Sequence, residues 1–191
     1  MNDSKEGSFP TIKVPLARPD IGEAEAQAAY RVVKSGWLIF GPETAAFERE
    51  FAAKIGVKHA VAVNSGTAAL LVAQAAAGLG AGDEVIVPDM TFVSTATASM
   101  YLGVTPVFGD ITMDDYGLDP AGIEALITPK TKAIIPVHYA GQSCRIEEIV
   151  RIARKHKLLV IEDAAESHLA KHAGRNTGAW GDLAIFSFTP S

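Results

Sequence analysis

A carboxylate follows an aliphatic run near the end of the chain. Residues 158–161 read Leu-Leu-Val-Ile, and Asp163 comes two residues after them. Such a run is typical of a parallel strand covered on both faces, and ligands of open α/β sheets bind beyond the carboxyl ends of these strands. A carboxylate buried there needs a cation or hydrogen-bond donors. Asp163 is therefore a candidate ligand-binding residue, although a helix N-cap explains the residue alone equally well.

A polar turn between a predicted strand and a predicted helix is the second candidate. Residues 63–70 read Val-Asn-Ser-Gly-Thr-Ala-Ala-Leu. Backbone N–H groups at the start of a helix point together toward an anion, and the hydroxyls of Ser65 and Thr67 add donors. The pattern suits a phosphate, but it is neither a Walker loop nor the dinucleotide fingerprint. Helix capping by Ser65 or Thr67 is the alternative interpretation.

An aromatic ring and a further hydroxyl follow two other aliphatic runs. Phe92 comes after the run 85–87, and Ser187 comes directly after the run 183–186. In a parallel sheet the carboxyl ends of these strands share one edge with Asp163. A phosphate site, a flat ring and a carboxylate are what a flat, phosphorylated, nitrogen-containing heterocycle needs. For Phe92 alone, packing in the core is the alternative.

Aliphatic runs alternate with helix-length segments along most of the chain. Strands are predicted at 60–63, 85–87, 104–108, 133–135, 158–161 and 183–186. Helices are predicted at 22–34, 43–55, 67–80, 92–102, 120–127 and 146–156. This alternation predicts a mostly parallel sheet with helices on both faces, a three-layer α/β/α fold. Residues 1–13 are predicted to be an N-terminal tail.

Composition excludes several classes of protein. The chain has 191 residues, 48% of them hydrophobic, and a net charge of −5. It can therefore bury a core, and it offers no cationic surface for nucleic acid. The apolar stretch 68–79 is shorter than the ~18 residues that a membrane span needs. Because Cys144 is the single cysteine and the first residues lack the apolar core of a secretory signal, we expect a cytoplasmic protein.

Two histidines have the spacing of a zinc-binding helix. His168 and His172 are four residues apart, as in metal sites built on helices. Gly174 follows them closely, and no glutamate lies between them. We therefore interpret both as surface histidines and expect no metal.

Several segments, taken in chain order, resemble one protein family. They are residues 65–70, 82–88, 91–92, 103–107, 136–138, 162–165 and 181–188. This ordered set resembles the DegT/DnrJ/EryC1/StrS family of sugar aminotransferases, which depend on pyridoxal phosphate and have fold type I. The resemblance implies that residues 14–191 form the cofactor-binding large domain, incomplete on its C-terminal side. The small C-terminal domain of the family would lie outside the sequence.

The resemblance also implies roles for the candidate residues. Cofactor contacts are implied for Gly66, Thr67, Ala68, Phe92, Asp163, Glu166 and Ser187. The turn 66–68 and Ser187 would bind the phosphate, and Phe92 would stack on the pyridine ring. Asp163 would pair with the pyridine nitrogen and keep it protonated. Glu166 would lie near the phenolic oxygen of the cofactor, where two negative charges repel, so we expect it to be protonated or turned toward substrate.

The residue that defines catalysis in this family lies outside the sequence. The resemblance places the Schiff-base lysine immediately after Ser191, so we expect the sequence to be part of a longer chain. Within the sequence, Asp163 and Glu166 would support catalysis. Trp37, His138 and Tyr139 would contact the substrate, with ordinary packing as the alternative.

The implied reaction is a transamination. An amino acid, L-glutamate in most of the family, would donate its amino group to a keto group on a nucleotide-linked deoxysugar. A homodimer with shared active sites is expected for fold type I. Two alternatives remain open. One is a sugar 3-dehydratase of the same fold, in which histidine replaces the lysine, and the other is a regulatory relative without turnover.

Overall fold

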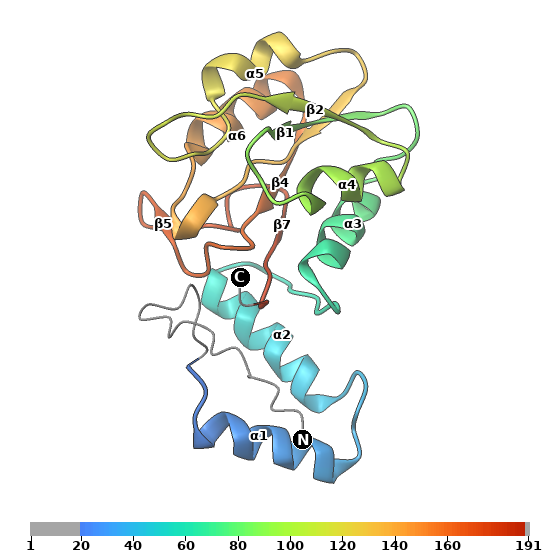
Figure 1. The fold of residues 1–191 in the computed structure, drawn as a ribbon, viewed down its shortest axis with the longest axis vertical. Coiled ribbons are helices and arrows are strands. Elements are labelled where there is room, and N and C mark those ends of the chain that lie inside the picture. The colour runs from blue at the N-terminus through green and yellow to red at the C-terminus, as the bar shows by residue number, and fades with distance from the viewer. Residues whose placement is uncertain (1–19, 190–191) are drawn as a thin grey trace, which may run out of the picture. The chain divides into compact units, whose positions relative to one another are not determined.

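The computed structural model describes residues 20–189, which fall into two compact units (Figure 1). The first contains residues 20–38 with Thr189, and the second contains residues 39–188. The first unit holds the helix α1 (Glu23–Ser35), which begins where the backbone N–H of Gly22 donates to the Glu25 carboxylate at 2.8 Å. It ends at Gly36, whose φ of 78° is a left-handed conformation that glycine adopts readily. The predicted tail, residues 1–13, lies outside the described residues.

A parallel sheet of five strands forms the centre of the second unit. Its strands are β1 (Glu84–Pro88), β2 (Thr105–Gly109), β3 (Thr131–Ile134), β4 (Leu159–Asp163) and β7 (Leu183–Ile185), in the order β2-β1-β3-β4-β7. Every pairing in this sheet is parallel, as the alternation of elements predicts. A short antiparallel pair, β5 (Lys171–His172) with β6 (Arg175–Asn176), was not predicted, because two residues are too few to show a period.

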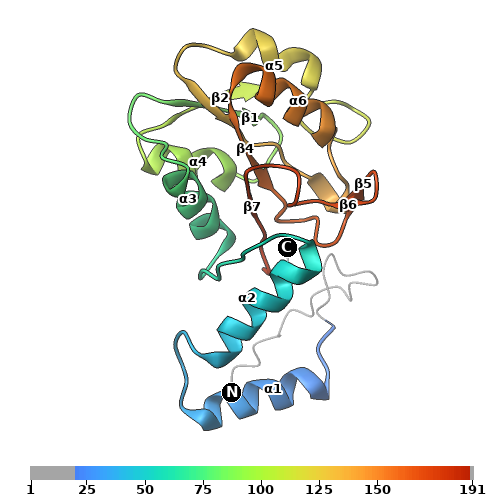
Figure 2. The same cartoon turned by 180° about the vertical axis from the view of Figure 1, so that it is seen from behind.

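Helices cover both faces of this sheet. They are α3 (Gly66–Ala76), α4 (Ser94–Tyr101), α5 (Pro120–Leu126) and α6 (Ile146–His156). The unit also contains α2 (Pro42–Ile55) and a 3₁₀ turn, η1 (Tyr139–Gly141). The views from front and back show α3 and α4 on one face and α5 and α6 on the other (Figures 1 and 2). The predicted three-layer α/β/α fold is thus confirmed.

Neighbouring residues of one strand pack against the helices on opposite faces of the sheet. Ile161 packs in the core cluster that contains the buried residues of α3 and α4, whereas Val160 packs in the cluster that contains those of α5 and α6. This is the period of two that strand geometry imposes. By the same period, Glu162 and Asp163 at the end of β4 point toward opposite faces of the sheet.

The predicted strand at residues 60–63 is wrong, because the structure has no strand there. The backbone N–H of Ala62 donates to Oε1 of Glu48 at 2.8 Å, so a side chain accepts the hydrogen bond that the backbone of a neighbouring strand would accept in a sheet. Val61 is 75% exposed. An aliphatic run forms a strand only where a neighbouring backbone can pair with it, and no other strand of the described part pairs with this segment.

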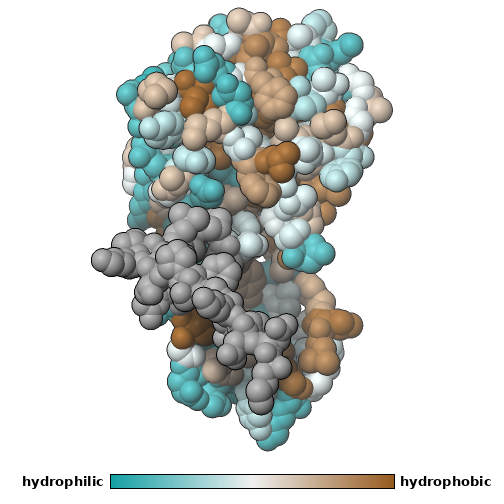
Figure 3. Space-filling model, viewed as in Figure 1, coloured by the Kyte–Doolittle hydropathy of each residue, from teal (hydrophilic) through white to brown (hydrophobic). Residues whose placement is uncertain are grey.

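Within residues 20–189, no helix has both the length and the hydrophobicity that a crossing of the membrane demands. Large apolar side chains nevertheless remain on the surface of the second unit, among them Val93, Tyr101 and Phe108. The space-filling view shows such hydrophobic patches between polar residues (Figure 3).

Candidate active site

Asp163 is the last residue of β4, at the carboxyl edge of the sheet. It is 4% exposed, and its Oδ2 accepts a hydrogen bond from the Thr95 hydroxyl at 2.8 Å. Its Oδ1 accepts one from the backbone N–H of Ala165 at 3.2 Å. Burial raises the pKa of Asp163, against the effect of these two hydrogen bonds. Because no lysine or arginine of residues 20–189 pairs with it, Asp163 is a buried acid without a cationic partner.

A short chain of hydroxyls supports Asp163 from α4. The Oγ atoms of Thr91 and Thr95 are 2.7 Å apart, and Thr95 is 0% exposed. Thr95 lies in α4 and Thr91 lies shortly before it, and neither residue was predicted to contribute to the site. No helix follows Asp163; its contact with Ala165 closes a turn, and the helix-cap interpretation does not apply.

The start of α3 has the form of an anion site. Ser65 caps the helix, since its Oγ accepts the N–H of Ala68 at 3.1 Å, which confirms the capping interpretation for this residue. The N–H groups of Gly66 and Thr67 have no acceptor among the described residues. The Thr67 hydroxyl lies 2.8 Å from that of Ser94 at the start of α4. Two N–H groups and a hydroxyl therefore remain for an anion.

Ser187, just after β7, lies directly against this helix start. A Cβ placed on Gly66 would come within 2.9 Å of the Cβ and 3.0 Å of the Oγ of Ser187. Only a glycine lets the two segments approach this closely. The structure therefore brings together the predicted phosphate contacts Gly66, Thr67, Ala68 and Ser187.

Phe92 is on the surface and is not a core residue. Its side chain is 72% exposed, which excludes packing in the core. Its carbonyl accepts the N–H of Thr95 at 3.0 Å, so Phe92 and the residue that holds Asp163 belong to one turn. An exposed ring beside a buried carboxylate leaves a face free for a flat ligand.

Glu166 lies on the loop that follows Asp163. Its side chain is turned toward η1, where its Oε2 accepts the backbone N–H of Ala140 at 2.9 Å. Tyr139 in the same turn is half-buried and packs edge-on against Tyr116, with ring centroids 6.1 Å apart. Contacts of Tyr139 with substrate and of Glu166 with cofactor stay predictions.

His138, which was expected to contact the substrate, is enclosed in the protein. It is 0% exposed, and its Nε2 lies 2.9 Å from Oε2 of Glu162. Its Nδ1 accepts the backbone N–H of Cys144 at 3.2 Å. Since both ring nitrogens are engaged inside the protein, the geometry supports the alternative of packing. No role was predicted for Glu162. Because it is the neighbour of Asp163 on a strand, its side chain is expected on the opposite face of the sheet.

Three other residues named from the sequence are Trp37, His168 and His172. Trp37 belongs to the first compact unit, and its contact with substrate stays a prediction. His168 packs 4.8 Å from Phe188 between ring centroids, whereas Nε2 of His172 lies 3.7 Å from Glu147. The two histidines thus have different partners. Among the described residues, no group of three His, Cys, Asp or Glu side chains could hold a metal ion.

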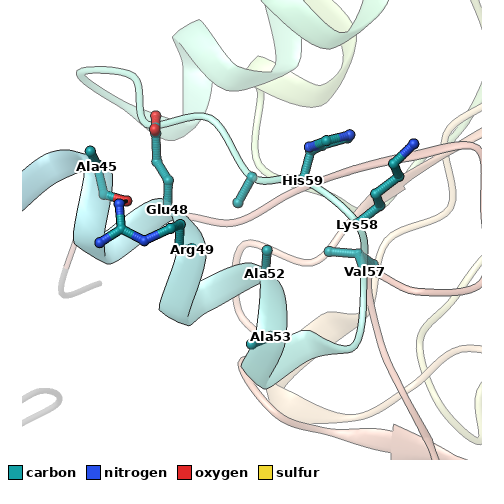
Figure 4. Close-up of a pocket in the computed structure, with 9 residues that line it drawn as sticks. Ala45, Glu48, Arg49, Ala52, Ala53, Val57, Lys58 and His59 are labelled. Carbon is teal, nitrogen blue, oxygen red and sulfur yellow. Dashed lines mark hydrogen bonds between the residues drawn. The ribbon is translucent and has the colours of Figure 1, made fainter.

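A concavity lies beside α2. It is an open pocket of about 500 Å³, lined by Ala45, Glu48, Arg49, Ala52, Ala53, Val57, Lys58, His59 and Ala60 (Figure 4). No residue predicted to contact the cofactor lines it, and Glu48 is already bound to the Ala62 backbone. The sheet edge at Asp163 is therefore the better candidate active site.

The donor set at the sheet edge fits one class of ligand. Free N–H groups at the start of α3 suit a phosphate, and the buried carboxylate of Asp163 suits a protonated ring nitrogen. The exposed ring of Phe92 suits a flat heterocycle between them. Pyridoxal phosphate combines these three features, so the residues present fit the expected cofactor.

Comparison with known proteins agrees with this chemistry. The chain is 48% identical over 175 residues to the spore coat polysaccharide biosynthesis protein SpsC of Bacillus subtilis, covering 92% of this chain and 45% of SpsC. It is 45% identical over 177 residues to GDP-perosamine synthase of Caulobacter vibrioides, covering 92% of this chain and 48% of the synthase. The chain thus spans about half the length of these relatives.

A solved structure supports the fold and the cofactor. The PLP form of the putative sugar aminotransferase Spr1654 from Streptococcus pneumoniae is 33% identical, with a TM-score of 0.88 over 92% of this chain and 49% of that one. The model of the DegT/DnrJ/EryC1/StrS aminotransferase family matches residues 19–191. Aminotransferases of this family use pyridoxal phosphate, as the sequence predicts. The chain therefore belongs to the DegT/DnrJ/EryC1/StrS aminotransferase family.

Proposed function

We propose that the protein binds pyridoxal phosphate at the carboxyl edge of its sheet and transfers an amino group from an amino acid to a nucleotide-linked keto-deoxysugar. The single observation that carries the proposal is Asp163, a buried acid with a raised pKa and no cationic partner in the described chain. A carboxylate in this state gains a partner when a protonated ring nitrogen arrives. The family and the geometry of the site support the same cofactor.

Each residue at the edge has a distinct task in this proposal. Asp163 holds a proton on the ring nitrogen, and Thr95 fixes its carboxylate through the hydrogen bond to Oδ2. The N–H groups of Gly66 and Thr67, with Ser187, hold the phosphate. Phe92 covers one face of the ring. When bound, pyridoxal phosphate supplies an electron sink for the bonds at the α-carbon of the amino acid.

The substrates follow from the relatives. Names such as polysaccharide biosynthesis protein and GDP-perosamine synthase support a sugar nucleotide as the amino acceptor. We propose L-glutamate as the donor, so that 2-oxoglutarate and an amino sugar nucleotide are the products. Glu166, Tyr139 and Trp37 are the proposed substrate-side residues, and the Schiff-base lysine is expected immediately after Ser191.

A homodimer with shared active sites is part of the proposal. Phe92 and Val93 are 72% and 63% exposed at neighbouring positions, and adjoining exposed apolar side chains are typical of an interface. A second subunit over this edge would cover it and exclude water from the reaction. We place the protein in the cytoplasm, where sugar nucleotides are made and where a lone buried Cys144 stays reduced.

The test is the transfer of labelled nitrogen. The intact protein, pyridoxal phosphate and ¹⁵N-glutamate are incubated with a panel of keto-deoxysugar nucleotides, and mass spectrometry detects ¹⁵N in the sugar. Asp163→Asn should abolish the transfer, whereas Asp114→Asn, on an exposed partner of Arg145, should leave it unchanged. No labelled sugar from any acceptor would refute transamination. Loss of water from the sugar without gain of nitrogen would instead indicate the 3-dehydratase.

A further inference from the structure

Glu162, the neighbour of Asp163 on β4, is the centre of a second polar cluster on the other face of the sheet. It is 0% exposed. Its Oε1 accepts the backbone N–H groups of Trp180 and Gly181, both at 2.7 Å. Its Oε2 accepts the N–H of Gly178 at 2.8 Å and lies 2.9 Å from Nε2 of His138. Burial by itself would raise the pKa of Glu162, but the hydrogen bonds from His138 and Gly181 outweigh burial and hold the pKa below its usual value.

The protonation of His138 follows from its second contact. The backbone N–H of Cys144 points at Nδ1 over 3.2 Å. A backbone N–H can only donate, so Nδ1 must present its lone pair. The ring proton is then on Nε2, which donates to Glu162. The pair is a carboxylate joined to a neutral imidazole, and all four donors around Glu162 are satisfied by its two oxygens.

Glu162 and its donors belong to three segments that each lead to a predicted cofactor contact. His138 directly precedes η1, whose Ala140 holds Glu166. Glu162 directly precedes Asp163, and the carbonyl of Asp163 accepts the N–H of His138 at 3.0 Å. The turn 178–181 leads into β7 and so to Ser187. One side chain therefore links the end of β4, the segment that follows β3 and the turn that precedes β7.

We propose that Glu162 and His138 are positioning residues, whose hydrogen-bonded pair fixes the relative places of Asp163, Glu166 and Ser187 for the cofactor. This inference rests on the proposed function, because Asp163 and Ser187 are proposed cofactor contacts and Glu166 is a proposed substrate-side residue. Neither Glu162 nor His138 touches the cofactor itself, since Glu162 faces the opposite side of the sheet and His138 is enclosed.

The two nitrogens of His138 allow a sharp test. In His138→Gln the amide N–H reaches the position of Nε2 and can still donate to Glu162, but the acceptor for Cys144 is lost. In His138→Asn the shorter amide can still accept from Cys144, but the donor to Glu162 is lost. If the link to Glu162 positions the site, the Gln variant must bind pyridoxal phosphate more tightly than the Asn variant.

The experiment measures cofactor binding by the intact protein. Pyridoxal phosphate is titrated into cofactor-free protein, and the dissociation constant and the induced circular dichroism of the bound cofactor at saturation are recorded. Glu162→Gln should raise the dissociation constant about tenfold or more, because the NH₂ group of its amide cannot accept a hydrogen bond from the N–H donors that it faces. It should also change the induced circular dichroism of the bound cofactor. Glu124→Gln, on an exposed partner of Lys155, is the matched control and should change neither.

Each outcome decides the proposal. A folded Glu162→Gln protein with the wild-type constant and signal would overturn it, as would an Asn variant of His138 that binds as well as the Gln variant. If Glu162→Gln fails to fold, the two His138 variants still decide. A wild-type protein that binds pyridoxal phosphate but aminates no sugar would refute the proposed function and leave this comparison valid. A wild-type protein that binds no cofactor would overturn both.

Discussion

The contact between Gly66 and Ser187 makes Gly66→Ala an informative perturbation. The added Cβ would lie 2.9 Å from the Cβ of Ser187 and 3.0 Å from its Oγ. Carbon atoms in good contact are about 3.5–4.0 Å apart, so the overlap approaches an ångström. Because the Cβ of Ser187 is attached to the backbone just two residues after the end of β7, it can move away only if that backbone moves away from the start of α3.

The size of the effect follows from opposing terms. Overpacking of this kind costs about 1–3 kcal/mol, and the better helix propensity of alanine returns at most about 1 kcal/mol. We expect the free energy of unfolding to fall by about 1–2 kcal/mol. Because the shift separates two proposed phosphate contacts, pyridoxal phosphate should bind about tenfold more weakly, a change of about 1.4 kcal/mol.

Chemical denaturation and cofactor titration of the intact protein measure the two quantities. Gly122→Ala in α5 is the matched control, because nothing lies within 4 Å of its added Cβ. It should stabilise the protein by about 0.5–1 kcal/mol and leave binding unchanged. The double variant Gly66→Ala with Ser187→Gly removes the overlap and should recover stability but not binding. A Gly66→Ala protein with unchanged stability and cofactor affinity would refute the close approach.

Three further predictions follow from the same edge of the sheet. Asp163→Asn should stabilise the cofactor-free protein by about 1 kcal/mol. The stability difference between this variant and the wild type should grow as the pH rises through the raised pKa of Asp163, because the wild type must then ionise a buried acid. Denaturation measured at several pH values checks this, with Asp114→Asn as the control. The stability from Glu162 should be present above its ordinary pKa of 4.5 and be lost as the pH falls through its lowered pKa, so Glu162→Gln should flatten the acid limb of the same curve. Phe92→Leu should change the free energy of unfolding by less than about 0.5 kcal/mol but weaken cofactor binding about 2- to 12-fold through lost stacking. Phe108→Leu is the control, because its ring on β2 is also exposed, and it should leave binding unchanged. Equal dissociation constants for the two variants would contradict the stacking role.

Most of the fold was predictable because the aliphatic runs of the central strands are enclosed on both sides. Val85, Ile134 and Ile161 are 0% exposed, and uninterrupted apolar runs report such burial directly. The run 60–63 shows where this reasoning fails. Its composition matches that of the true strands, but pairing depends on a neighbouring backbone, which a local pattern does not contain.

The predicted site was found only in part, for a related reason. Phe92, Asp163 and Ser187 lie at or shortly after strand ends, and topology alone brings strand ends to one edge. Thr95 was missed because its contact with Asp163 joins residues 68 positions apart in the chain. Polar contacts between distant segments leave no periodic signal in either segment.

Two adjacent carboxylates show how one strand can supply both structure and chemistry. Glu162 collects four donors, and its pKa is lowered despite burial. Asp163 collects two, and burial raises its pKa. The pleat of the strand places the two side chains on opposite faces of the sheet. The carboxylate on one face can therefore have all its hydrogen bonds, while the carboxylate on the other face lacks a cationic partner. A fully satisfied Glu162 costs little and holds the backbone in place, and that rigidity is what allows Asp163 to remain buried and unpaired until a cationic ligand binds.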